Sequence, residues 1–218
     1  MSLAVLRARV ARLVAAERAS ADLSIDEHVL DAALVFSRRR PRRVVVDLVG
    51  TGGWYLPLPA DWVPGFSDVL EVEYPAGQRP PAALSPREWW CPYGTPDGEH
   101  LAFKELTPPA GATVRVTISA PHLVDEDATT LPQSHWDTIV KLAAGSACLA
   151  LAAFYSHQED QTMALDGVRH GSKAGEFQSR GKAFRAEAEA ELPELEAQAV
   201  TAAGGEVSFA GEMHFLTH

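Results

Sequence analysis

Apolar residues recur every three or four positions near the start of the chain, which predicts an amphipathic helix. Its stripe consists of Leu3, Leu6, Val10, Leu13 and Val14. A second helix is predicted between Ser24, whose hydroxyl can accept from the backbone N–H of Glu27, and Pro41, which disfavours a helical residue before it. Its buried face is predicted to contain Ile25, Val29, Ala33 and Phe36.

The pattern changes to a period of two after the second helix. Residues 44–119 hold 11 of the 15 prolines and four of the five tryptophans, and short β-branched runs alternate with turn residues. Strands are predicted at 44–49, 69–74, 88–93, 100–105 and 113–119. In the run 69–74 the acidic residues should face water. Short strands at this spacing indicate a small antiparallel sheet, sandwich or barrel.

Helical periodicity returns after Pro132. One long helix is predicted over 133–158, where Gly145 would let another helix approach closely, and a fourth begins near Phe177 and ends or kinks at Pro193. Residues 160–171 read as a loop. The predicted fold is α+β, a bundle of about four helices with an inserted antiparallel β domain. The divisions are a helical pair at 1–43, the β insert at 44–120, long helices at 121–201 and an extended C-terminal arm at 202–218.

Composition narrows the possible classes of function. The net charge is −10, which argues against a protein that coats nucleic acid with its whole surface. The charge is uneven: residues 1–60 carry +3 and the remainder −13. Two cysteines without a CxxC exclude a disulfide framework and a zinc knuckle.

Membrane association is not expected. The most apolar run, 142–155, is shorter than the roughly 20 residues of a spanning helix. Arginines interrupt the N-terminal apolar run, so it does not read as a secretory signal. The same segment has the Arg-rich composition of a transit peptide, but a packed helix is the favoured interpretation.

Catalytic and metal-binding motifs are not found in the sequence, so no catalytic residue, metal or cofactor is predicted. His135 and His157 are too far apart to share a metal, and His214 and His218 would need a helix at the chain end. The acidic run 125–127 is interpreted as solvated charge near a helix start, and a hydrolase pair or a calcium site as the alternative. The glutamates between 187 and 196 read as a solvated helix face. Trp89 and Trp90 read as core and interface residues rather than a ligand platform.

A cluster of five arginines within six residues is the most specific candidate binding feature of the sequence. They are Arg38, Arg39, Arg40, Arg42 and Arg43, at the end of the second predicted helix. Helix C-capping accounts for some of them. The excess predicts either pairing with acids of a neighbouring subunit, which the net charge favours, or contact with DNA phosphates.

The C-terminal arm is predicted to dock onto a partner polypeptide. Its apolar residues, too few for a separate core, are Val207, Phe209, Met213, Phe215 and Leu216. Gly204 and Gly205 separate it from the preceding helix. Strand addition to another protein would cover these side chains.

Several segments together resemble a known family. They are the capped start at 24–27, the aromatic and proline-rich run 54–62, the strand and turn 69–77, the Trp-bearing strand after it, and the run 172–177. In these segments the chain is similar to the head–tail adaptor, or neck, proteins of long-tailed bacteriophages and gene transfer agents. The resemblance covers nearly the whole chain, but it consists of aromatic, proline and glycine positions.

The resemblance implies a helical bundle that carries a β insert and assembles into a ring, commonly of twelve copies, under the portal protein. It implies arms that reach a tail-side connector or stopper protein, and genomic DNA passing through the centre. The protein would be found in the virion, after assembly in the bacterial host cytoplasm, and no catalytic residue is carried over.

Two other classes of protein remain open. One is a small carbohydrate hydrolase that uses loop carboxylates, about 5–10 Å apart, and the Trp89/Trp90 region. The other is a monomeric regulator with the arginines as a nucleic-acid patch. A measurement of particle size would distinguish a ring of many copies from either of these monomeric proteins.

Overall fold

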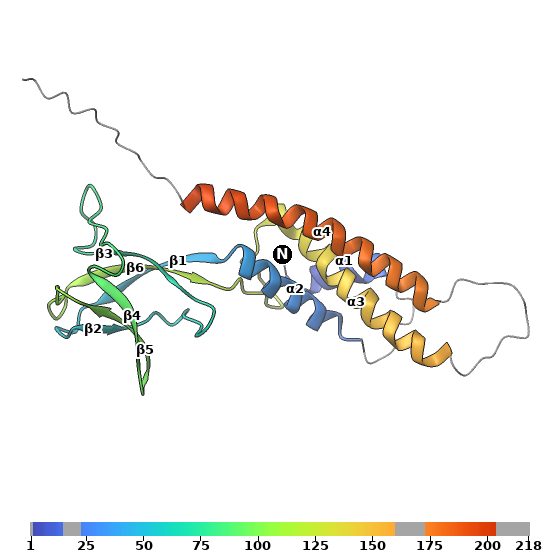
Figure 1. Cartoon of the computed structure of the whole chain (residues 1–218), viewed down its shortest axis with the longest axis horizontal. Coiled ribbons are helices and arrows are strands. Elements are labelled where there is room, and N and C mark those ends of the chain that lie inside the picture. The colour runs from blue at the N-terminus through green and yellow to red at the C-terminus, as the bar shows by residue number, and fades with distance from the viewer. Residues whose placement is uncertain (1, 15–22, 160–172, 204–218) are drawn as a thin grey trace, which may run out of the picture.

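The computed structural model describes residues 2–14, 23–159 and 173–203. These residues form a helical bundle and a β module, which follow one another along the long axis of the molecule (Figure 1). The fold is α+β, with four α-helices and two small antiparallel sheets in the described residues, which confirms the predicted class.

The bundle is built around one central helix. Helices α1 (Leu3–Val14), α2 (Ile25–Arg39) and α4 (Lys173–Ala203) all pack against α3 (Trp136–Glu159), which follows a short 3₁₀ turn, Gln133–His135. Four members of the predicted α1 stripe are buried and Leu13 is partly buried. On the predicted α2 face Val29, Ala33 and Phe36 are buried and Ile25 is partly buried. Ser24 caps α2 by accepting from the Glu27 N–H at 3.4 Å. The N-terminal segment is therefore a packed amphipathic helix, as predicted.

Two glycines set the closest approach between α3 and α4. A Cβ atom added to Gly181 would lie 2.9 Å from the Gly145 carbonyl oxygen. One added to Gly145 would lie 3.2 Å from the Gly181 carbonyl oxygen. The prediction that Gly145 permits close helix packing is confirmed.

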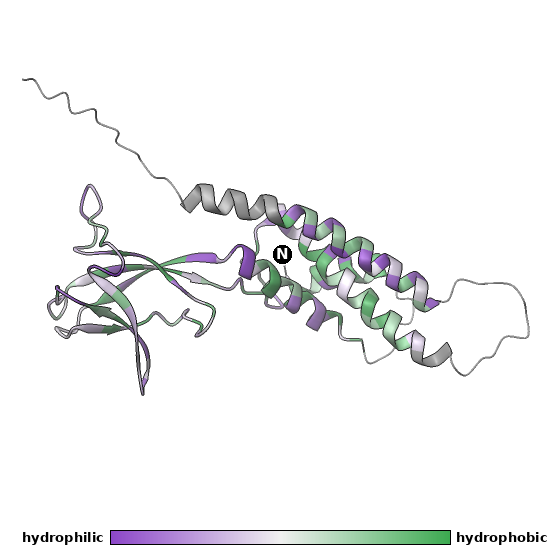
Figure 2. Cartoon of the chain, viewed as in Figure 1, coloured by the Kyte–Doolittle hydropathy of each residue, from purple (hydrophilic) through white to green (hydrophobic). Residues whose placement is uncertain are grey.

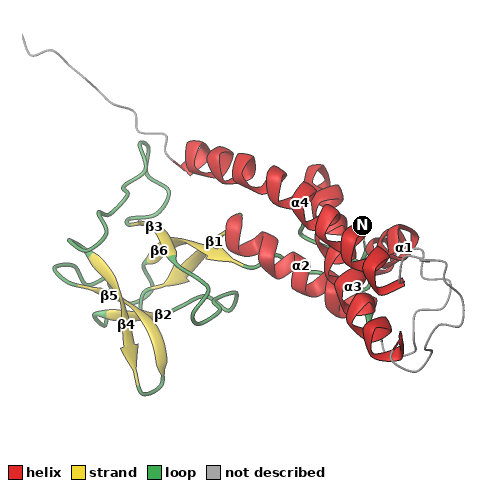
Figure 3. Cartoon of the chain, turned by 45° about the vertical axis from the view of Figure 1, so that its right-hand side comes forward, coloured by secondary structure: helices red, strands yellow, loops and turns green. Residues whose placement is uncertain are grey.

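The β module contains two three-stranded sheets (Figure 3). One has the order β1-β6-β3 and the other β2-β5-β4, and every pairing is antiparallel. The strands are β1 (Arg42–Val49), β2 (Tyr55–Pro57), β3 (Val69–Glu73), β4 (Trp90–Thr95), β5 (Gly98–Phe103) and β6 (Thr113–Ala120). Their shared core contains Leu56, Val72, Trp90, Leu101, Phe103, Val114, Val116 and Ile118.

Strand β3 departs from the predicted alternation. A bulge between Val69 and Glu71 shifts its register against β6. Leu70 is therefore exposed, while Glu73 is buried and accepts hydrogen bonds from the Gly77 N–H at 2.8 Å and from Arg115 at 3.3 Å. The prediction that the acidic residues of this strand all face water is wrong, because a bulge changes which face a side chain occupies.

Of the two outcomes predicted at Pro193, a helix end or a kink, the helix end is wrong, because α4 continues through Pro193 to Ala203. The segment Gln133–Ser156 is long and apolar enough to cross a membrane by length and composition, contrary to expectation. The segment is largely coloured as hydrophobic in Figure 2. In its most apolar window of 18 residues 56% is buried inside the protein, as for the core helix of a bundle.

Candidate functional site

The arginine cluster lies where the chain passes between the bundle and the β module. The chain leaves the bundle at the end of α2, enters β1 at Arg42 after Pro41, and returns from β6, where Ala120 pairs with Arg42. Both crossings are therefore adjacent in space, and we call this region the junction. It contains the last turn of α2, the start of β1, and residues 120–135.

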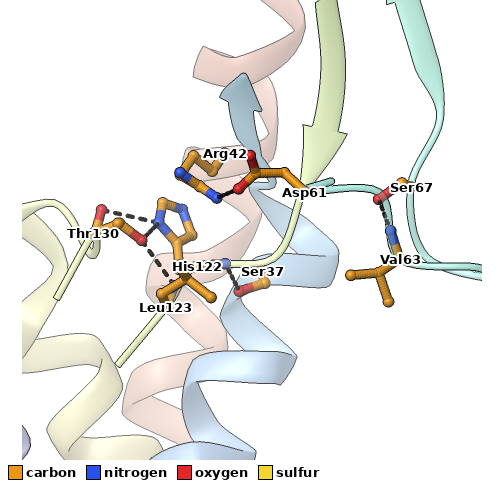
Figure 4. Close-up of polar contacts among 8 residues, drawn as sticks. All are labelled: Ser37, Arg42, Asp61, Val63, Ser67, His122, Leu123 and Thr130. Carbon is orange, nitrogen blue, oxygen red and sulfur yellow. Dashed lines mark hydrogen bonds and ion pairs between the residues drawn. The ribbon is translucent and has the colours of Figure 1, made fainter. Parts of the chain in front are cut away.

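A hydrogen-bond network joins the returning chain to α2 (Figure 4). The buried Ser37 hydroxyl donates to the Ala33 carbonyl at 2.6 Å and accepts from the His122 backbone N–H at 2.9 Å. Thr130 Oγ1 accepts from the Leu123 N–H at 2.8 Å and lies 3.3 Å from His122 Nδ1. These bonds fix the return path at the point where the two bodies meet.

Two histidines contact Arg40 at the C-terminal end of α2. His122 Nε2 lies 3.1 Å from the Arg40 carbonyl, and His135 Nε2 lies 2.5 Å from Arg40 Nη1. Their rings flank Phe36, each with its centroid 5.5 Å from the Phe36 centroid. Burial lowers the pKa of both imidazoles. The positive charge of Arg40 lowers the pKa of His135 further, whereas hydrogen bonds to the Thr130 and Arg40 carbonyls partly offset the effect of burial on His122. Neutral His135 can then accept from the arginine.

The five arginines do not form one patch, which corrects the placement of the whole cluster at a helix end. Arg38 and Arg39 lie in the last turn of α2, and Arg40 is its C-cap. Arg42 and Arg43 belong to β1, because Pro41 ends the helix and the extended backbone begins at once.

Two of these arginines form ion pairs with acids among the described residues. Arg42 donates to Asp61 at 2.8 Å, and Arg43 lies 3.9 Å from Glu71. The buried Nε atom of Arg42 has no hydrogen-bond partner among the described residues. Arg40 and Arg42 therefore have structural roles at the junction. Arg38, Arg39 and Arg43 are exposed, and of these Arg43 lies near Glu71.

The glutamates of α4 are not a purely solvated face, contrary to the sequence interpretation. Glu191 accepts from Lys141 at 3.0 Å and from the buried Thr138 hydroxyl, and Glu187 lies 3.3 Å from Lys141. The Thr138 hydrogen bond, followed by Lys141, lowers the pKa of Glu191, and the two glutamates raise the pKa of Lys141. These groups join α3 to α4.

A groove opens between α2, α3 and α4. Its volume is about 440 Å³, and its apolar lining comes from Ala32, Val35, Leu142 and Leu192. Its polar lining comes from Asp31, Arg39, Ser146, Arg185 and Glu189. One member of the arginine cluster thus borders an apolar hollow on the bundle.

Sequence reasoning missed an aromatic cluster on the outer face of the β2-β5-β4 sheet. Trp54 lies 5.1 Å from Tyr55 and 5.0 Å from Tyr93, and Tyr55 lies 4.9 Å from His100, measured between ring centroids. We call Trp54, Tyr55 and Tyr93 the aromatic ridge. Its signal was the pair Trp54-Tyr55 after two glycines, but only strand pairing brings Tyr93 beside them.

Other predicted site residues have structural positions. Trp90 belongs to the β core and donates to the Leu84 carbonyl at 3.0 Å, while Trp89 lies in a turn and packs against that core. The interpretation of Trp90 as a core residue is confirmed, and Trp89 is partly buried against the same core. Cys148 is buried, which raises the pKa of its thiol.

The acidic run 125–127 lies beside the start of α1 rather than α3. The Leu3 N–H donates to the Asp125 carbonyl at 2.9 Å, and Glu126 lies 3.2 Å from Arg7. Among the described residues, no group of three or more His, Cys, Asp or Glu side chains is arranged to hold a metal ion. His157, His214 and His218 fall outside the described side chains, as do all five predicted docking residues of the arm.

Comparison with known proteins adds no identification. No protein-family model matches the chain, and no curated protein matches it with significance.

Proposed function

We propose that this protein is a structural subunit of a head–tail adaptor ring, which links a portal protein to a tail-side connector or stopper. The observation that carries the proposal is the insertion of a six-stranded β module between α2 and α3 of a four-helix bundle, counted over the described residues. That arrangement agrees with the architecture implied by the resemblance at 24–27, 54–62, 69–77 and 172–177.

The distribution of charge supports the same proposal. A ring subunit needs two different faces, because each copy contacts its neighbours head to tail. The first 60 residues carry +3 and the remainder −13, so the chain holds an excess of each sign in different segments, although several of the arginines pair with acids of the same chain. A net negative ring would also repel the DNA backbone and let the genome slide through its centre.

The role of the arginines in the proposal is narrower than the sequence suggested. Arg40 and Arg42 bind His135 and Asp61 of their own chain, so replacing them would disturb the junction. Arg38 is exposed and forms no ion pair with a described residue, so it is the member proposed to meet a neighbouring subunit or the DNA.

The decisive experiment deletes the codons for the C-terminal arm from the gene for this protein, in the genome that encodes the particle. Deletion of residues 206–218 should yield filled heads and separate tails that do not join, while the purified variant keeps the circular dichroism spectrum and melting temperature of the intact chain. Electron microscopy counts the joined particles.

A milder variant separates the loss of side chains from the loss of length. The triple variant Val207→Ser, Phe209→Ser and Phe215→Ser should also prevent heads from joining tails. The control variant Val45→Ser, at an exposed residue, should not. Normal particles that contain the truncated protein, or particles that lack the protein altogether, would refute the proposed function.

A further inference from the structure

Strand β1 is an outer strand of its sheet, and one of its two edges faces away from every other described strand. The sheet order is β1-β6-β3, so β6 lies on one side of β1 only. Directly after β1, the Gly50 N–H donates to the Ala112 carbonyl at 2.7 Å, on the β6 side. Backbone groups of residues two apart in a strand point the same way, so the even-numbered residues of β1 face β6 and the odd-numbered residues face outward. Ser119, which lies opposite Arg43, agrees with this, because its N–H donates to the Asp68 carbonyl on the β3 side at 2.9 Å.

Four residues of β1 therefore present backbone N–H and C=O groups to the open edge. They are Arg43, Val45, Asp47 and Val49. No hydrogen bond joins these backbone groups to another described residue. Their side chains are exposed too, with Val45 at 59% and Val49 at 67%. A row of unpaired backbone groups is a template for pairing with a further strand.

The other outer strands are protected in ways that β1 is not. Residues 82–84 run beside β3, where the Leu84 N–H donates to the Val72 carbonyl at 2.8 Å. Strand β4 contains Pro92, and the three-residue β2 ends in Pro57. Short strands and prolines are devices that prevent sheet edges from pairing. Strand β1 has eight residues, no proline and an unbroken register, so its edge suits strand addition.

The C-terminal arm has the sequence pattern of a strand that could fill this edge. Residues 206–218 outnumber the eight residues of β1 and contain no proline, so each of them can donate a backbone N–H. Apolar residues occupy the odd positions, namely Val207, Phe209, Met213 and Phe215. Polar residues occupy even positions, namely Glu206, Ser208, Glu212 and His214. As a strand, the arm would have one face for a core and one for water.

One antiparallel register matches both faces of the arm to β1. Every described strand pair in the two sheets is antiparallel. With Glu212 opposite Arg43, Val207 falls opposite Leu48, which packs at the margin of the β core, so the apolar face of the arm would extend that core. The Arg43 side chain is 51% exposed, and its distance of 3.9 Å to the Glu71 carboxylate is longer than a hydrogen bond. Arg43 can therefore bind a second carboxylate.

We infer that the C-terminal arm of one copy adds as an antiparallel strand to the open β1 edge of the next copy. The arm and the edge are two different surfaces, so the contact runs head to tail, and repeating it generates a ring when the rotation closes. The inference rests on the proposed function, because it names the contact that joins the ring subunits.

The test changes each surface in the full-length chain. The edge variant, Val45→Pro, removes an outward N–H and leaves the hydrogen bonds to β6 in place. Its matched control is Val45→Ser, which keeps that N–H. The arm variant is the triple serine variant at Val207, Phe209 and Phe215, and its control is Ser208→Ala with His214→Ser, on the other face of the arm. Native mass spectrometry measures the mass, and circular dichroism checks the fold.

The expected result is a ring for the intact chain and for both controls, and monomers of 23.5 kDa for the edge variant and the arm variant. The edge variant keeps its arm and the arm variant keeps its edge. A mixture of the two should therefore form heterodimers of twice that mass and nothing larger.

Hydrogen exchange tests the same contact without a substitution in β1. In the ring of the intact chain, the amides of Arg43, Val45, Asp47 and Val49 should be protected from exchange. In the arm variant these four amides should exchange quickly, while the even-numbered amides between them stay protected by β6. Equal protection in both proteins would contradict the inference even if Val45→Pro failed to fold.

The possible failures are distinguishable. If the edge variant or the arm variant still forms rings, the inference is wrong and the proposed function stands. If the intact chain remains a monomer at every concentration, the ring premise of the proposed function fails, and the inference fails with it. Protection of the outward β1 amides in such a monomer would place the arm on its own chain.

Discussion

Replacing Gly181 with alanine tests the close contact between α3 and α4. The added Cβ would lie 2.9 Å from the Gly145 carbonyl oxygen, 3.0 Å from Leu149 Cγ and 3.2 Å from Cys148 Cβ. The first of these neighbours is a backbone atom, so it cannot move out of the way by a side-chain rotation. Helices α3 and α4 must separate to accept the methyl group.

The net effect is a difference between two opposed contributions. Overpacking a tight contact costs about 1–3 kcal/mol. Replacing a helical glycine with alanine contributes about 1 kcal/mol in the other direction, through helix propensity. We expect a net loss of about 1 kcal/mol, equivalent to a melting temperature lower by about 2–4 °C in a chain of this size.

The assay is thermal and urea unfolding, followed by circular dichroism at the helical band. Ser179→Ala is the matched control, because Ser179 is exposed on the same helix and its replacement only improves propensity. Gly145→Ala should destabilise similarly, and the double variant should cost less than the sum, because helices already separated accept the second methyl more easily. If Gly181→Ala stabilises the protein as the control does, the close contact is wrong.

Three further predictions concern the half-buried His122 and the buried side chains of Phe36 and Glu73. Burial lowers the pKa of His122 in the folded state, so the free energy of unfolding is highest above the ordinary pKa of about 6.5 and falls as the pH drops below it. In urea titrations at several pH values, His122→Gln should reduce this dependence of the free energy of unfolding on pH. Phe36→Ala should cost about 3–5 kcal/mol by leaving a cavity at the junction, against a small change for exposed Val35→Ala in the same assay. Glu73→Ala should cost about 1–3 kcal/mol because the Gly77 N–H loses its acceptor, and Glu73→Gln should recover part of it.

The sequence alone was sufficient for the order and type of most elements. Helical periodicity located α1, α2, α3 and the first part of α4, and alternation located all the strands except β2. These patterns arise from neighbours three, four or two residues apart, so a short window contains the information. Strand β2 was missed because it is three residues long and ends in proline.

The candidate sites were less accessible to sequence reasoning. The Arg38–Arg40 turn and the β1 arginines are adjacent in sequence but lie on different elements with different partners. Their partners lie elsewhere in the chain, Asp61 after β2 and His122 and His135 after β6. No local pattern encodes such a pairing, since it depends on where β6 returns the chain.

The sequence by itself determined that this protein is an α+β chain with a β insert between helical segments, and it predicted the small residue that lets α3 and α4 approach. Only the tertiary structure decided that Glu73 is buried, that Tyr93 joins Trp54, and that a groove separates α2 from α4. Each of these depends on a bulge, a strand register or a helix packing distance. Such quantities are set by contacts between residues far apart in the chain, which is why they are settled only when the whole core is assembled.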